Sequence, residues 1–134
     1  MKKASQQHWH VFYQKLGFLF YSIAAADKII RDEEVAELHK QVMENWIRLE
    51  DTKDDFGSDA AYQIEIVFDW ILDNETNGER AYQIFEEYFQ SNSEMFDDEI
   101  KQKIYTTAEK ISMSYHGVNK SEASNILRLH TLLG

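Results

Sequence analysis

Apolar residues near the start of the chain recur in alternating steps of three and four, which is the spacing of one face of an α-helix. Three aromatic residues between positions 18 and 21 widen this face until the second half of the segment is apolar on most sides. A helix of that kind is usually buried. We therefore predict a central helix over about residues 6–26. Its core face consists of Trp9, Phe12, Leu16, Leu19, Ile23 and Ala26.

Five further segments show helical spacing, over about residues 32–49, 59–73, 79–90, 97–116 and 118–133. The chain has no proline, only five glycines and no long alternation of period two, which disfavours strands. We predict an all-α, compact single-domain helical bundle of about six or seven helices. The predicted inner faces are, helix by helix, Val35, Leu38, Val42, Trp46 and Leu49; Ile64, Val67, Phe68 and Ile71; Ala81, Ile84, Phe85, Tyr88 and Phe89; Ile100, Ile104, Ala108, Ile111 and Tyr115; and Ala123, Ile126, Leu127 and His130.

A helix–elbow–helix pattern occurs twice in the chain. A shift of 88 positions brings similar residues of the two segments together, with Ile23 on Ile111, Ile30 on Val118, Glu34 on Glu122 and Leu38 on Ile126. The pattern predicts two related units, about residues 6–50 and 95–134, within a single domain that spans residues 1–134. We expect the first helix to lie beside its counterpart over about residues 97–116.

Charge restricts the classes of partner. The chain has 14 basic and 24 acidic residues, for a net charge of −10, so phosphate backbones and anionic lipids would repel it. We expect a protein partner, with no nucleic-acid or membrane binding. The absence of cysteine excludes disulfides and thiolate ligands and is compatible with a cytoplasmic location, which we predict.

No catalytic motif is present in the sequence. No histidine follows a glutamate by three positions, there is no His-Glu-x-x-His, and no glycine-rich loop could bind phosphate. We therefore expect no enzyme, no catalytic residue and no organic cofactor. The three tryptophans and seven tyrosines exceed what a small core needs. They form either a large aromatic core with polar tips at its rim or a binding patch beside carboxylates.

The first elbow, residues 24–35 with the sequence AAADKIIRDEEV, resembles the signature of the TerB-like family, which is associated with tellurite resistance. That signature is roughly Ala-x-Ala-Asp-Gly-x-Ile-x-x-x-Glu, and Lys28 stands where glycine is usual. The second copy is degenerate, because Tyr115 replaces the aspartate. The resemblance implies a compact helical domain of two related halves, a stress-linked binding or scaffolding role, and acidic residues that bind a divalent metal. The matching residues are Ala24, Ala26, Asp27, Ile30 and Glu34 in the first copy, and Val118 and Glu122 in the second.

The metal residues implied by the resemblance are Asp27, Glu34 and Glu122. As a calcium loop, the first elbow would have Ile23 and Ala25 at its first and third ligand positions, and neither has a side-chain oxygen. The pattern thus excludes a high-affinity EF-hand. A weak divalent-cation site would form only if the two elbows meet in space. The alternative is structural: Glu34 caps its helix and Asp27 stabilises the turn.

Three functional hypotheses remain open on the sequence. The first is a non-enzymatic TerB-like binding or scaffolding module with weak divalent-cation binding, which a carboxylate cluster would favour. The second is an acidic inhibitor or immunity-type protein that masks a basic partner surface, which an acidic face with exposed aromatic residues would favour. The third is a helical enzyme, which requires a deep pocket that holds histidine and carboxylates.

Overall fold

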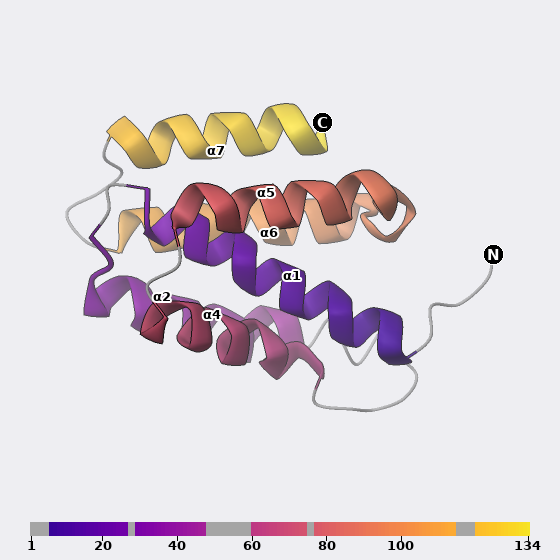
Figure 1. Cartoon of the computed structure of the whole chain (residues 1–134), viewed down its shortest axis with the longest axis horizontal. Helices are drawn as coiled ribbons and strands as arrows, with labels where there is room; N and C mark the ends of the chain where they lie inside the picture. Colours follow the sequence, from indigo (N-terminus) through magenta and orange to yellow (C-terminus); the bar gives the residue numbers. More distant parts are fainter. Residues whose placement is uncertain (1–5, 27–28, 48–59, 75–76, 115–119) are drawn as a thin grey trace.

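In the computed structural model, six α-helices carry most of the described residues, which are 6–26, 29–47, 60–74, 77–114 and 120–134 (Figure 1). Side chains are described for all of these except residues 6, 7 and 120–122. Within this part of the chain there is no strand, which confirms the all-α prediction. The α-helices are α1 (Gln6–Ala24), α2 (Asp32–Gln41), α4 (Gln63–Asp73), α5 (Gly78–Ser91), α6 (Asp98–Met113) and α7 (Lys120–Leu133).

Helix α1 crosses the middle of the bundle and contacts α4, α5, α6 and α7 (Figure 1). Leu16, Leu19 and Ile23 are completely buried, as the spacing predicts. The expected neighbour of this helix, α6, packs directly against it. The two helix–elbow–helix units, α1–α2 and α6–α7, are therefore in contact with each other. Their common origin as a repeat stays a prediction.

Helices α1 and α4 approach each other closely at Gly17. A Cβ atom at this position would lie 2.9 Å from the carbonyl oxygen of Ile64 and 2.9 Å from the Cβ of Val67. Only a residue without a side chain allows that approach without a shift of one helix. This contact fixes which face of α4 is turned inward. Its inner residues Ile64, Phe68 and Ile71 are fully buried, as predicted.

The second predicted helix consists of α2 followed directly by a π-helical segment, η1 (Val42–Trp46). The sequence predicts a regular helix to about residue 49, and residues 48 and 49 lie outside the described part. Trp46 is completely buried, and its indole N–H donates a 3.0 Å hydrogen bond to Thr107 of α6. That bond satisfies a polar group that the core would otherwise leave unpaired.

Helices α5 and α6 each have a side-chain cap at the N-terminus. Asn77 accepts hydrogen bonds from the backbone N–H groups of Glu79 and Arg80 at the start of α5. At the start of α6, Asp97 accepts one from the N–H of Ile100 at 2.9 Å. Each cap satisfies backbone donors that have no partner within the helix. The short 3₁₀ turns η2 (Ala60–Tyr62) and η3 (Ser93–Met95) precede α4 and α6.

The prediction for the inner face of α7 was wrong for three of its four residues, and the fourth, Ile126, is half-buried. Leu127 is 69% exposed, and Ala123 and His130 are also exposed, whereas Leu129 and Leu133 are buried. Helix α7 packs against α6 and α1, and it is rotated so that Leu129 and Leu133 are its buried residues. His130 lies at the surface against Tyr105, with ring centroids 3.9 Å apart. This stacking covers the imidazole without placing it in the core.

Candidate functional site

Glu34 is the one predicted metal residue whose side chain is described, and it has a structural position. Its side chain is 1% exposed, and Oε1 accepts a 2.9 Å hydrogen bond from the backbone N–H of Arg31. The N–H of Glu34 in turn donates to the carbonyl oxygen of Arg31. Glu34 thus caps the start of α2, which corresponds to the structural alternative raised by the sequence. The guanidinium of Arg31 lies 3.8 Å from the same carboxylate.

The other two predicted metal ligands fall outside what the structure describes. Asp27 lies in the undescribed connection after α1, and only the backbone of Glu122 is described, within α7. No group of three or more potential metal ligands occurs among the described residues. The predicted weak cation site therefore stays a prediction. Nor does the described part of the chain contain a helix that is long and apolar enough to cross a membrane.

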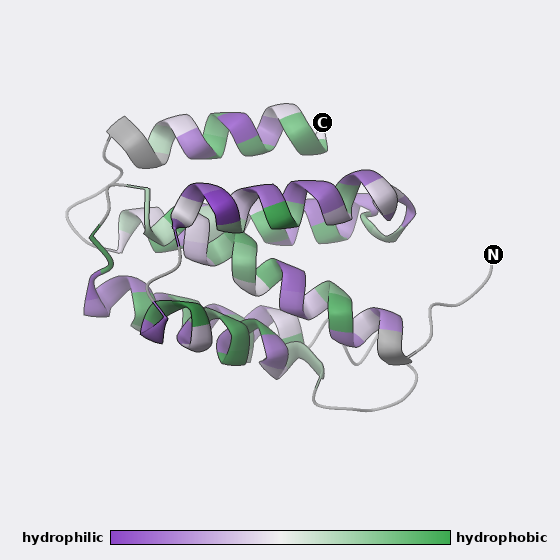
Figure 2. Ribbon diagram, viewed as in Figure 1, coloured by the Kyte–Doolittle hydropathy of each residue, from purple (hydrophilic) through white to green (hydrophobic). Residues whose placement is uncertain are grey.

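Two large apolar side chains are exposed on the outer side of α4. Ile66 is 55% exposed and Trp70, one turn further along, is 58% exposed. At the start of the helix the hydroxyl of Tyr62 donates to the sulfur of Met43, which is itself 55% exposed. The sulfur contact places Met43 of η1 beside Tyr62, the residue that precedes α4. Figure 2 shows that hydrophobic and hydrophilic residues alternate along α4.

Carboxylates border this apolar row. On α4, Glu65 and Asp69 directly precede Ile66 and Trp70, and Asp73 follows Trp70 by three positions and is exposed. His39 of α2 bridges the first two, with Nδ1 3.3 Å from Glu65 and Nε2 3.7 Å from Asp69. Burial raises the pKa of Glu65 from its ordinary value, although the nearby His39 opposes this shift. We call Glu65, Ile66, Asp69, Trp70 and Asp73 the α4 face.

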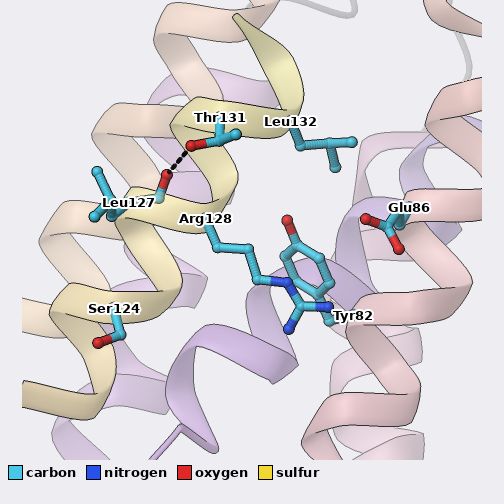
Figure 3. A pocket seen from close by; sticks show the side chains of 7 residues that line it. All are labelled: Tyr82, Glu86, Ser124, Leu127, Arg128, Thr131 and Leu132. Atoms are coloured by element: carbon cyan, nitrogen blue, oxygen red, sulfur yellow. Dashed lines mark hydrogen bonds between the residues drawn. The ribbon is translucent and has the colours of Figure 1, made fainter.

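The described residues also form an open groove of about 570 Å³ between α5 and α7. Arg128 of α7 lies over the ring of Tyr82 of α5, 4.0 Å from its centroid (Figure 3). Both terminal nitrogens of Arg128 donate to Glu79, at 2.8 and 2.9 Å. Burial raises the pKa of Tyr82 to about 12, so its hydroxyl is protonated at neutral pH. Glu86, Ser124, Leu127, Thr131 and Leu132 complete the lining.

The comparisons with known proteins leave the family open. No protein-family model, no curated protein and no solved structure matches this chain. The TerB-like resemblance thus stays a prediction, and any function must follow from the chemistry of the α4 face and of the groove.

The sequence contained a signal for the α4 face but none for the groove. Ile66 and Trp70 are apolar residues outside the predicted inner stripe of their helix, which is the usual sign of an exposed apolar position. Tyr82 and Arg128 are far apart in the chain and belong to no motif. Only the packing of α7 beside α5 brings them together (Figure 3).

Proposed function

We propose that this protein is a non-enzymatic binding module. Its α4 face binds a basic, amphipathic segment of a protein partner. The observation that carries the proposal is the exposure of Trp70 and Ile66, 58% and 55%, one turn apart on a single helix. Tryptophan is enriched among the residues that dominate binding energy at protein interfaces. Two large apolar side chains one turn apart suit the apolar face of a partner helix.

Charge specifies the partner further. Asp69 and Asp73 lie beside the apolar row, and the whole chain has a net charge of −10. Lysine or arginine residues that border the partner's apolar face would meet these carboxylates and speed the encounter. This arrangement supports the hypothesis of an acidic module that masks a basic partner surface more than that of a cation-dependent scaffold. A protein partner, rather than nucleic acid, is also consistent with the acidic charge.

Trp70 provides a direct test, because Trp9 and Trp46 are 7% and 0% exposed and acrylamide would quench them weakly. The probe is a synthetic helical peptide of leucine and lysine with all leucines on one face. We expect it to shift the emission of Trp70 to shorter wavelength and to protect it from acrylamide. Added salt should weaken the complex, because the flanking charges are exposed. A peptide of the same composition in scrambled order should bind more weakly.

Two double variants separate the α4 face from general charge attraction. Asp69→Asn with Asp73→Asn should weaken peptide binding by about three- to tenfold, since both charges border the apolar row. Asp98→Asn with Glu109→Gln makes the same charge change at exposed positions of α6 and should have a smaller effect. Equal losses in the two doubles, or an unchanged spectrum of Trp70 at saturation, would refute the proposed site.

A further inference from the structure

The groove between α5 and α7 has a chemical character that the α4 face does not share. The residue Tyr82 is 1% exposed, and its hydroxyl has no hydrogen-bond partner among the described residues. The hydroxyl lies at the floor of the groove and points toward Leu132, with Glu86 to one side (Figure 3). A buried hydroxyl without a partner is costly, and a ligand that donates a hydrogen bond to its oxygen removes part of that cost.

The polar groups of the groove are mostly acceptors. The two terminal nitrogens of Arg128 already donate to Glu79, so its charge is compensated within the protein. Thr131 donates its hydroxyl proton to the carbonyl oxygen of Leu127 at 3.1 Å, which leaves the threonine oxygen as an acceptor. Glu86 adds a carboxylate. Because Glu79, outside the lining, already compensates Arg128, the charge that remains in the lining is that of Glu86, and the groove favours a ligand that is positively charged and donates hydrogen bonds.

The geometry points to a binding site in this groove for a primary ammonium group on an aliphatic stem. The ammonium would donate to the Glu86 carboxylate and to the Tyr82 hydroxyl oxygen. Leu127, which is 69% exposed, and Leu132 would cover the hydrocarbon stem. Because the hydroxyl is buried in the free protein, binding requires a small movement of the side chains around it. The groove's volume falls within the range of small-ligand sites.

The sign of the ligand charge can be tested with two probes of equal length. Hexylammonium and hexanoate have the same stem and opposite charges. We expect hexylammonium to cause saturable changes in the amide NMR signals of α5 and α7, and hexanoate to cause none. A third probe is lysine methylamide acetylated at its α-amine, which keeps the side-chain ammonium. This probe distinguishes the source of the ammonium. Equal binding of this probe would assign the site to a lysine side chain of a protein, and its exclusion would assign it to a free amine.

Three single variants locate the site. Glu86→Gln keeps the shape of the side chain and should weaken hexylammonium binding about tenfold, through loss of a charge-assisted hydrogen bond. Glu87→Gln is the matched control, because Glu87 is an exposed neighbour that pairs with Arg80 outside the groove lining. Tyr82→Phe should weaken binding by a smaller factor while the melting temperature stays the same or rises, because an unpartnered hydroxyl is removed.

Three outcomes would overturn the inference. The first is that hexanoate shifts the same signals with equal affinity, which would make Arg128 and not Glu86 the recognising group. The second is that Glu86→Gln and Glu87→Gln weaken binding equally, which would indicate general attraction to an acidic surface. The third is that saturating hexylammonium leaves the signals of α5 and α7 unchanged. None of these results depends on the α4 face.

Discussion

The indole N–H of Trp46 and the hydroxyl of Thr107, which are 61 positions apart in the chain, form a buried hydrogen bond of 3.0 Å. Both residues are completely buried. The bond joins the π-helical continuation of α2 to the centre of α6, and it does so with side chains from the two helix–elbow–helix units. It therefore fixes the relative position of these helices at one point in a largely apolar core.

Thr107→Val tests this contact. Valine has nearly the shape of threonine but cannot accept the hydrogen bond, so a buried indole N–H is left without a partner. We expect a loss of about 1–3 kcal/mol in the free energy of unfolding. The neighbouring Thr106 is exposed, and Thr106→Val should change stability by less than about 0.5 kcal/mol. Urea denaturation of the two variants measures the difference, and similar values would contradict the assignment.

Glu34→Gln tests the structural role of the elbow against the metal hypothesis. The variant weakens the cap on the backbone N–H of Arg31 and removes a favourable charge from the start of α2. We expect a loss of about 1 kcal/mol, the same in calcium, magnesium or manganese as in chelator. Glu33→Gln, at an exposed position of the same turn, is the control. Micromolar metal binding that is lost in Glu34→Gln would instead restore the metal site.

Leu19→Ala and Leu127→Ala form a pair that separates core from surface. Leu19 is completely buried in α1, so its truncation leaves a cavity and should cost about 2–5 kcal/mol. Leu127 is 69% exposed on α7, and its truncation should cost less than about 0.5 kcal/mol. Thermal melting measures both. A large loss at Leu127 would mean that the inner face of α7 is the one that the sequence pattern predicts.

The ion pair of Glu79 with Arg128 predicts a pH dependence. The hydrogen bonds from Arg128 lower the pKa of Glu79 below its ordinary value of 4.5. The folded state therefore binds this proton less tightly than the unfolded state, and the stabilisation is present above pH 4.5 and lost as the pH falls through the lowered pKa.

Glu79→Gln removes this contribution. Both side chains are more than one third exposed, so we expect a loss of about 0.2–1 kcal/mol at neutral pH, reduced by salt. The gap between wild type and variant should close in acid. Glu109→Gln, at an exposed position of α6, should show no such closing gap. Urea midpoints measured across the acidic range test the sign, and a gap that widens toward low pH would contradict it.

The arrangement of the inner helices could be predicted from the sequence because their apolar stripes are wide. In α1 the stripe is reinforced by aromatic neighbours, so a small error in rotation still places Leu16 and Leu19 inside. In α7 apolar residues occur on more than one side. Its stripe could be drawn through Leu127 or through Leu129 and Leu133, and only the packing against α6 and α1 decides between them.

The candidate surfaces differ in the same way. The exposure of Trp70 follows from its place outside the inner stripe of α4, which is a local property of the sequence. The groove depends on Tyr82 and Arg128, and their contact is set by how two distant segments pack. The helical spacing of α5 predicts Phe85 inside but leaves Tyr82, which is also buried, unassigned. Periodicity reports the direction of a side chain and not its partner.

The unequal attachment of α1 and α7 has a consequence for hydrogen exchange. Helix α1 contacts four other α-helices, whereas among the described side chains of α7 only Leu129 and Leu133 are buried. It is joined to α5 by the exposed ion pair of Arg128 with Glu79 and by the contact of Arg128 with the ring of Tyr82. Amides of α7 should therefore exchange through local detachment, at a lower free energy than those of α1, which require global unfolding. Each such detachment would uncover the hydroxyl of Tyr82 at the floor of the groove.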